Sequence, residues 1–376
     1  MPELIESEGA LHAALPALRG ARSLALDTET DAFFAYRPKV CLLQVSIPGR
    51  DLLVDPLAGF DVAPLGEILA DPAREVVLHA AENDVIMLKH QFGWRIGSLY
   101  DTQVACFVLG LPPYSLAGVL EARFGVKLDK KMQRSDWSRR PLERAQVEYA
   151  AEDTRHLLAL AGDLHARAQT AGRVEEIASE CARMAARDWS PEPFDPDGYR
   201  KIDGARELDG VPLRILRDLY LFRNAEAEGR NRAPYRVAGD AVLVGIAKAQ
   251  ALRRGPGVPE SFLGRYGRQV ASIVEEAKKR GPLEERKARR PRGEPVPPEV
   301  QERFERLRRW RTEAAKRRGV EPFVVARNDL LFQVAQRGCR TIEDLSGVME
   351  PFRVREYGGA ILDSLGGGSD NASQER

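Results

Sequence analysis

Residues 24–30 constrain the fold of this chain more than any other segment. Leu24 and Leu26 alternate with other residues, as in a half-buried β-strand. Asp27 and Glu29 follow, and their side chains point to the same face because they are two residues apart. Two neighbouring carboxylates repel each other, so one should hold a proton unless a cation lies between them. The pattern predicts either a site for Mg²⁺ or Mn²⁺, which prefer oxygen ligands, or an ordinary solvated strand end.

The length of 376 residues exceeds what one hydrophobic core usually supports, so two or three domains are expected. A composition of 43% hydrophobic and 30% charged residues is typical of soluble globular proteins. None of the four cysteines forms a C-x-x-C pair, which argues against a zinc site and favours a reducing, cytoplasmic location. No apolar run approaches the roughly 20 residues of a membrane span, so no membrane association is expected.

The net charge of +1 conceals an uneven distribution. Residues 1–200 carry 22 Lys and Arg against 30 Asp and Glu, whereas residues 201–320 carry 29 against 17. A basic block beside an acidic one suggests a module that binds a polyanion next to a module that binds metal ions. A solvated, arginine-rich helical surface would give the same charge pattern.

Apolar runs bounded by turn residues predict a strand meander over residues 21–55 and a further strand at 75–80. Residues 96–99 predict another short strand, and Asp101 stands where the N-cap of the next helix is expected. Residues 141–168 predict one long helix. Strands followed by alternating strands and helices indicate a mixed α/β sheet with helices packed against it.

Three more residues could join the carboxylate pair. Asp84 lies near the start of its helix, where the helix dipole favours an anion. Tyr149 and Asp153 are four residues apart and share the inward face of the long helix. A buried Asp needs a partner, which could be a metal ion or a salt bridge to Arg144 or Arg155. Tyr149 could equally be an ordinary core aromatic.

The order Asp27-x-Glu29, then Asp84 after a strand, then Tyr149-x-x-x-Asp153 in a helix resembles the tyrosine subtype of the DEDD 3′→5′ exonucleases. Within that family the closer likeness is to ribonuclease D. The likeness covers residues 20–168 and implies a ribonuclease H-like α/β exonuclease domain with a mixed sheet. Supporting segments lie at residues 36–46, 79–80, 100–103, 128–137 and 140–142.

The resemblance implies that Asp27, Glu29, Asp84 and Asp153 hold two divalent ions, Mg²⁺ or Mn²⁺, about 3.5–4 Å apart. Tyr149 would orient the attacking water, because a phenol with a pKa near 10 is a poor base at neutral pH. The implied reaction removes 5′-mononucleotides from RNA 3′ ends, with tRNA precursors as expected substrates and a monomer as the expected state.

The sequence departs from some members of the family directly after Glu29. Thr30 and Asp31 stand where those members carry an aromatic residue. Three aromatic side chains nearby could stack on a nucleic-acid base instead, and the pattern does not choose among Phe33, Phe34 and Tyr36.

An internal repeat occupies the C-terminal half. Residues 219–223 match 307–311, and residues 234–238 match 322–326, at one offset of 88. Two copies indicate a duplicated helical domain, because a solenoid needs three or more stacked units. Each copy resembles the HRDC domain, an all-α module shared by helicases and ribonuclease D. The basic side chains expected to bind the phosphate backbone are Arg223, Arg230, Arg232, Arg236, Lys248 and Arg311.

Composition shifts predict the domain boundaries. The three prolines between residues 191 and 196 and the charged, proline-rich stretch near residue 290 are typical of linkers. The glycine- and serine-rich end is typical of disorder. The expected segments are an exonuclease domain at 1–170, a linker at 171–205, HRDC-like domains at 206–283 and 298–366, a linker at 284–297 and a disordered tail at 367–376.

Three other functions compete with this interpretation. A DNA 3′→5′ exonuclease of the same fold would use the same chemistry, although the paired helical repeats favour RNA. A helicase is excluded, because the sequence contains no G-x-x-x-x-G-K-[ST] loop. A non-catalytic RNA-binding protein on an inactive nuclease fold should lack at least one of the four acids, and all four are present.

Overall fold

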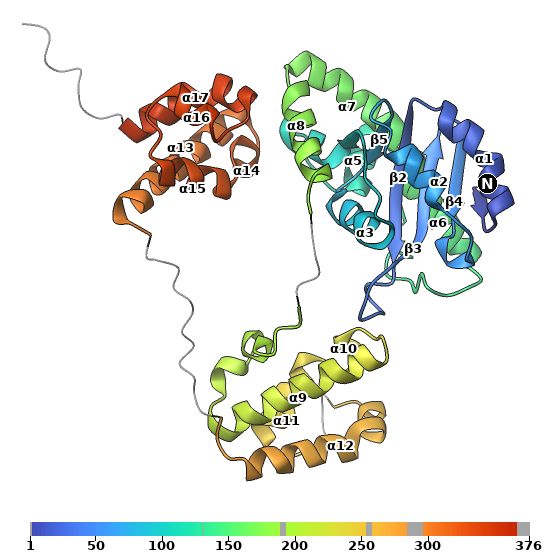
Figure 1. Cartoon of the computed structure of the whole chain (residues 1–376), viewed down its shortest axis with the longest axis vertical. Helices are drawn as coiled ribbons and strands as arrows, with labels where there is room; N and C mark the ends of the chain where they lie inside the picture. The colour runs from blue at the N-terminus through green and yellow to red at the C-terminus, as the bar shows by residue number, and fades with distance from the viewer. Residues whose placement is uncertain (1, 130, 189–192, 253–257, 284–295, 367–376) are drawn as a thin grey trace, which may run out of the picture.

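The chain folds into an α/β domain followed by two helical units (Figure 1). The computed structural model describes residues 2–129, 131–188, 193–252, 258–283 and 296–366. Most of the expected linker at 284–297, all of the expected tail, and residues 191–192 of the proline-rich stretch lie outside these ranges. Among the described helices, none combines the length and the apolar character needed to cross a membrane.

A six-stranded mixed sheet forms the centre of the α/β domain, in the order β1-β4-β3-β2-β5-β6. Strand β3 runs antiparallel to both of its neighbours, and the remaining pairs are parallel. The predicted mixed α/β sheet is therefore confirmed. The strands are β1 (Glu3–Ile5), β2 (Ser23–Thr30), β3 (Val40–Ile47), β4 (Arg50–Val54), β5 (Glu75–Leu78) and β6 (Leu99–Asp101).

Helices cover both faces of this sheet. On one face, Leu24 and Leu26 of β2 share a large apolar core with helices α1–α5, α7 and α8. On the other face, Leu42 and Leu53 pack with Trp137 and with Ala150 of α6. Every residue of β3 is buried, as expected for a strand covered on both sides. The helices are α1 (Glu8–Gly20), α2 (Ala63–Leu69), α3 (Glu82–Phe92), α4 (Thr102–Leu109), α5 (Leu116–Phe124), α6 (Arg144–Arg155), α7 (Leu157–Ala171) and α8 (Val174–Ala185), with a 3₁₀ turn η1 (Pro56–Ala58).

Two sequence expectations for this domain were wrong in detail. The helix expected at 141–168 is two helices, because the chain bends at His156 (φ −100°, ψ −5°) and sends α6 and α7 to different parts of the sheet. The segment expected as a linker at 171–205 begins with α8 instead. Ile177 and Cys181 of α8 are buried in the α/β core, so this helix belongs to that domain.

The two helical units repeat the same design. In the first unit, Arg223 donates to the carbonyl of Ala238 at 3.1 Å and to Asp240 at 2.5 Å. In the second, Arg311 donates to the carbonyl of Ala326 at 3.0 Å and to Asn328 at 2.7 Å. Each partner is 88 residues further along, which confirms the duplication. The helices are η2 (Gly198–Lys201), η3 (Ala205–Glu207), α9 (Gly210–Gly229), α10 (Pro234–Val237), α11 (Asp240–Ala249) and α12 (Glu260–Lys279), then α13 (Pro298–Arg318), α14 (Pro322–Val325), α15 (Asn328–Arg337), α16 (Ile342–Ser346) and α17 (Pro351–Gly366).

Candidate active site and nucleic-acid interface

The four acids singled out in the sequence line one pocket of about 600 Å³. Asp27 and Glu29 come from β2, Asp84 from the first turn of α3, and Asp153 from α6. Tyr149 lines the same pocket. Three elements that are distant in sequence thus bring the predicted residues together.

The end of the central strand β2 positions the first two carboxylates. Asp27 lies opposite Gln44 of β3, and Glu29 lies opposite Leu42. The pairing register shifts directly after Glu29, at Thr30, and such a bulge re-aims the side chains beside it. The alternation of β2 keeps Asp27 and Glu29 on the same face, as the sequence predicted.

The fully buried carboxylate of Asp101 holds the turn that leads into α3, the helix that carries Asp84. Asp101 accepts hydrogen bonds from the backbone N–H groups of Ala80 (3.1 Å) and Ala81 (2.7 Å), between β5 and α3. It also accepts from Gln103 (2.7 Å) and Val104 (3.1 Å), so its predicted role as the N-cap of α4 is confirmed. Ala80 has a positive φ of 60°, a conformation that costs free energy in a non-glycine residue. Asp101 offsets that strain and places α3.

Local sequence patterns do not indicate the contact that orients Asp84 itself. The hydroxyl of Thr28 donates to Oδ1 of Asp84 at 2.5 Å. Thr28 stands between Asp27 and Glu29 in β2, so this bond ties the strand to the start of α3. A hydrogen bond between segments 56 residues apart leaves no trace in local periodicity.

Tyr149 and Asp153 lie one turn apart on α6, where burial raises the pKa of Asp153 and the neighbouring phenol partly offsets that rise. The two arginines considered as salt-bridge partners for Asp153 are engaged elsewhere. Arg144 pairs with Glu148 at 2.8 Å, and Arg155 pairs with Asp51 at 2.8 Å. Asp153 therefore faces the pocket without a neutralising arginine from its own helix.

Burial raises the pKa of all four carboxyl groups, and nearby acidic side chains add to the rise. For Asp27 burial is the larger cause, followed by the charges of the other three acids. Burial likewise raises the pKa of Glu29 to about 9, with repulsion from Asp153 and Asp84 adding to it. The pKa of Asp84 rises to about 6 and that of Asp153 to about 7, again chiefly through burial. Such a cluster favours bound protons or bound cations.

The donor set fits a hard divalent cation, because it consists of carboxylate oxygens. Over the ranges that the structure describes, no three Asp, Glu, His or Cys side chains converge closely enough to hold an ion as they stand. The hydroxyl of Thr28 holds Oδ1 of Asp84, so rotation of the acidic side chains would be needed for coordination.

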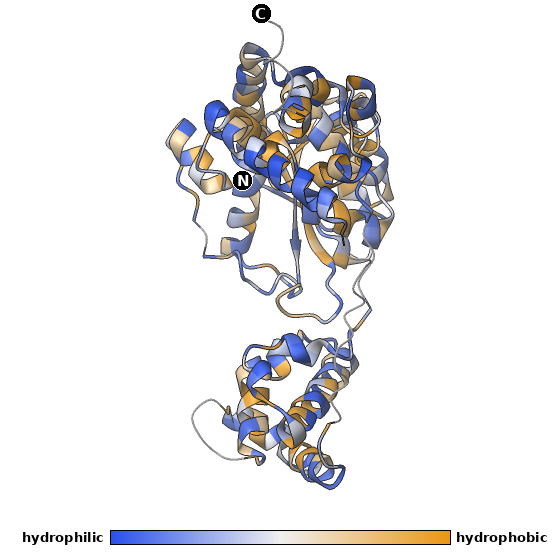
Figure 2. Cartoon of the chain, turned by 90° about the vertical axis from the view of Figure 1, so that its left-hand side faces the viewer, coloured by the Kyte–Doolittle hydropathy of each residue, from blue (hydrophilic) through white to orange (hydrophobic). Residues whose placement is uncertain are grey.

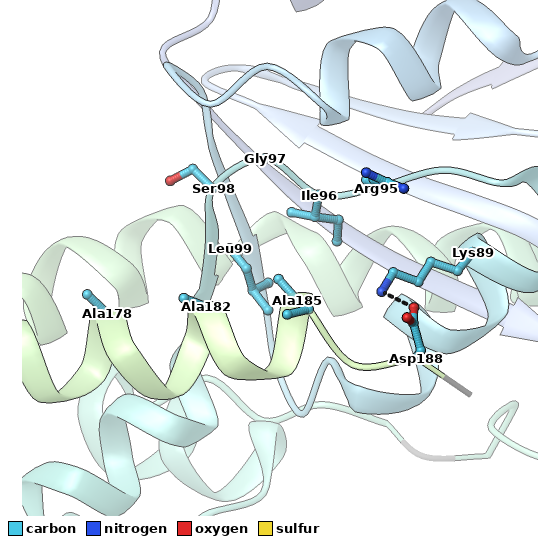
Figure 3. Close-up of a pocket in the computed structure, with 11 residues that line it drawn as sticks. Lys89, Arg95, Ile96, Gly97, Ser98, Leu99, Ala178, Ala182, Ala185 and Asp188 are labelled. Carbon is cyan, nitrogen blue, oxygen red and sulfur yellow. Dashed lines mark hydrogen bonds and ion pairs between the residues drawn. The ribbon is translucent and has the colours of Figure 1, made fainter. Parts of the chain in front are cut away.

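A second pocket lies between α8 and residues 95–99 (Figure 3). Its walls carry Ala178, Ala182 and Ala185, and its one ammonium group, on Lys89, is neutralised by Asp188 at 3.1 Å. None of the four pocket acids lines it. The described lining of the second pocket therefore lacks a cluster of carboxylates like the one at the end of β2.

Comparison with known proteins shows the family to which this chain belongs. Residues 2–169 match the model of the 3′-5′ exonuclease family, and residues 213–274 and 300–365 each match the HRDC domain. A ribonuclease D from Gluconacetobacter diazotrophicus is 33% identical over 287 residues, which cover 74% of this chain and 72% of that protein. The chain belongs to the ribonuclease D family.

Solved structures agree with this membership. Escherichia coli RNase D, described as an exoribonuclease involved in structured RNA processing, aligns with a TM-score of 0.62 and 25% identity. That alignment covers 97% of this chain and 98% of the other. The catalytic core of RRP6 from Trypanosoma brucei aligns with a TM-score of 0.68 and 25% identity over 74% of this chain and 80% of that one. The ribonuclease D member described here is a hydrolytic 3′–5′ exoribonuclease, and exonucleases of its family depend on divalent metal ions.

Two residues predicted to bind nucleic acid are structural instead. Arg223 and Arg311 are each only 8% exposed. Each donates to the carbonyl of the alanine that follows the short helix α10 or α14, and to the side chain of the first residue of the next helix, α11 or α15. A basic residue count cannot distinguish such inward-facing guanidinium groups from surface ones. That expectation was therefore wrong for this pair.

The other four predicted cations are exposed. Arg230 pairs with Glu226 at 2.9 Å, and Lys248 pairs with Glu207 at 2.5 Å. Arg232 and Arg236 instead line a cleft of about 320 Å³ in the first HRDC domain. Their assignment to nucleic acid stays a prediction, and these two have the better-placed charges.

Proposed function

We propose that Asp27, Glu29, Asp84 and Asp153 together hold two divalent cations, Mg²⁺ or Mn²⁺, at the 3′ end of an RNA strand. The observation that carries this proposal is the meeting of four carboxylates from β2, α3 and α6 in one pocket, where burial raises the pKa of each carboxyl group. Bound divalent ions would supply Lewis-acid stabilisation of the charge that develops at the scissile phosphate.

In this proposal Tyr149 positions the attacking water. Burial and the neighbouring carboxylates, Asp153 foremost, raise the pKa of its phenol well above the usual value. A phenol with so high a pKa stays protonated at neutral pH and is a poor general base. It can donate one hydrogen bond, and it lines the acidic pocket together with Asp153.

The proposed products are 5′-mononucleotides, released one at a time from RNA 3′ ends by a monomer. Transfer RNA precursors are the proposed substrates, since the E. coli relative is described as acting in structured RNA processing. The acidic α/β domain would cut, and the basic first HRDC domain would hold the strand by its phosphates.

The testing experiment compares 5′-end-labelled RNA and DNA of the same sequence, each incubated with Mg²⁺, with Mn²⁺ or with a chelator. The proposal expects a ladder shortened from the 3′ end on RNA in either metal, and no cleavage with chelator. The released nucleotide should carry a 5′-phosphate. Faster degradation of DNA would favour a DNA exonuclease, and cleavage that survives chelation would exclude the metal assignment.

A further inference from the structure

The two HRDC domains carry corresponding faces, formed by α10 with α12 in the first domain and by α14 with α17 in the second. The offset of 88 places Arg232 opposite Val320 and Arg236 opposite Val324. In the last helix the offset is 91. Tyr266 of α12 meets Phe222 edge to face at 5.6 Å, as Tyr357 of α17 meets Trp310 at 5.8 Å. The faces formed by α10 with α12, and by α14 with α17, therefore correspond residue by residue.

In the second HRDC domain this face packs against the exonuclease domain. Val320 and Val324 pack into the core of the exonuclease domain, and Phe323 meets Phe107 edge to face at 5.0 Å. Polar groups complete the contact, because Arg353 donates to Glu180 at 2.6 Å. The second HRDC domain thus uses this face to dock on the exonuclease domain.

In the first HRDC domain the corresponding face is an open basic cleft. Arg232 and Arg236 replace the docked valines, Tyr235 replaces Phe323, and Arg265 replaces Glu356, which in the second copy pairs with Arg173. The side chains of Arg232 and Arg265 are exposed and bond to no group in the described part of the chain. The change from valine and glutamate to arginine suits a polyanion instead of a docked protein surface.

The loop that borders the active site joins this cleft to it. Thr30, Ala32 and Pro38 line the acidic pocket, and the backbone between them reaches the first HRDC domain. The carbonyl of Phe33 accepts hydrogen bonds from the hydroxyl of Tyr235 at 2.5 Å and from Nε of Arg236 at 2.6 Å. Figure 2 shows loops of the exonuclease domain descending toward the first HRDC domain at the bottom of the view.

Two exposed rings flank this junction. Phe33 is 47% exposed and Tyr235 is 54% exposed. The other aromatic residues of the loop are occupied, because Arg236 lies over Phe34 at 3.7 Å and Tyr36 donates to Asn224 at 2.8 Å. Exposed rings beside basic side chains are the usual surfaces for stacking single-stranded bases.

We propose that the cleft of Arg232, Tyr235, Arg236 and Arg265 binds the phosphate backbone of single-stranded RNA upstream of the 3′ end, with Phe33 and Tyr235 stacking on bases. The proposal rests on the proposed function of the acidic pocket, into which the 3′ end of the same strand would enter. The second copy thus uses this face for apolar docking, whereas the first copy contacts the exonuclease domain through Tyr235 and Arg236 and exposes Arg232 and Arg265.

The test uses the full chain and the double variant R232E/R265E, with R206E/R268E as a control of equal charge. Arg206 and Arg268 are exposed residues of the same domain outside the cleft. Binding of a fluorescent 12-nucleotide RNA is measured with chelator, so that no strand is cut, across a salt titration. Turnover of a trinucleotide in Mg²⁺ is measured separately, as a check that the acidic pocket of the control variant is intact.

The cleft variant should bind the 12-mer roughly tenfold more weakly, and its log–log salt slope should fall by about 1.4, at about 0.7 per lost phosphate contact. The control should bind like the wild type, and its trinucleotide turnover should be unchanged. Equal weakening by both variants, or by neither, would overturn the cleft assignment. Absence of RNA cleavage by the wild-type chain would instead overturn the proposed function, whatever the binding result.

Discussion

Arg318 forms a bidentate pair with Glu176, with Nη1 2.9 Å from Oε1 and Nη2 2.8 Å from Oε2. The pair joins the end of α13 to α8, across the boundary between the second HRDC domain and the exonuclease domain. Glu176 is only 2% exposed, and Arg318 also donates to the carbonyl of Val108 at 2.8 Å. Fork-shaped pairs of this kind fix geometry as well as adding energy.

Arg318→Ala should destabilise the protein by about 3 kcal/mol, because it leaves the buried carboxylate of Glu176 with only the 3.4 Å contact to Arg173. The measurement is urea unfolding followed by tryptophan fluorescence. Glu276→Gln is the control, since it breaks an exposed ion pair with Lys279 in the first HRDC domain and should leave the unfolding midpoint in place. Matching curves for Arg318→Ala and the wild type would show that the pair contributes nothing to docking.

Asp27→Asn, Glu29→Gln, Asp84→Asn and Asp153→Asn should each lower RNA cleavage by at least about 10³-fold, since each removes a charge that would hold the ions. RNA binding in chelator should stay near the wild-type level, because the phosphate-binding cations lie in the first HRDC domain. Glu148→Gln is the matched control, an exposed carboxyl on the same helix as Asp153. Wild-type turnover by Asp153→Asn would remove that residue from the proposed metal site.

Tyr149→Phe should slow cleavage by about 10²–10⁴-fold through loss of one positioning hydrogen bond. The ring would remain beside Trp137, whose centroid lies 6.0 Å away, so the unfolding midpoint should hardly change. Single-turnover rates at saturating Mg²⁺ separate this effect from ion binding. An unchanged rate would assign Tyr149 to packing alone.

Local pattern was sufficient to pair neighbouring residues of the candidate site and insufficient for the way the domains join. Alternation along β2 placed Asp27 beside Glu29, and helical spacing placed Tyr149 beside Asp153, because both relations depend on residues close in sequence. Glu176 had no such signal. Its partner Arg318 is 142 residues away, so the sequence around α8 does not indicate that a second domain docks there.

Inward-facing arginines were hidden for a related reason. Arg223 and Arg311 stand in basic helices, and net charge does not tell which side chain turns inward to bind a carbonyl. The bend at His156 also lacked a sequence signal, because no proline or glycine marks it. Tertiary packing of α6 and α7 on different parts of the sheet decides it.

Metal binding should depend on pH in a direction fixed by the acidic pocket. The pKa values of Glu29 (about 9), Asp153 (about 7) and Asp84 (about 6) lie above the ordinary carboxyl value of about 4. The metal-free folded state therefore binds more protons than the unfolded chain between about pH 4 and pH 9, and its stability should fall as pH rises through that window.

Divalent ions should reverse that trend, since they replace the protons. Saturating Mg²⁺ should raise Tm more at pH 8 than at pH 5.5, because at pH 5.5 the carboxyl groups must first release protons. Differential scanning calorimetry with and without Mg²⁺ measures the difference, and Glu29→Gln should reduce both the pH dependence of the metal-free Tm and the Mg²⁺ effect. Glu148→Gln should change neither. An Mg²⁺-induced shift of equal size at both pH values would contradict proton displacement by the ions, and no shift at either would argue against the four carboxylates as their ligands.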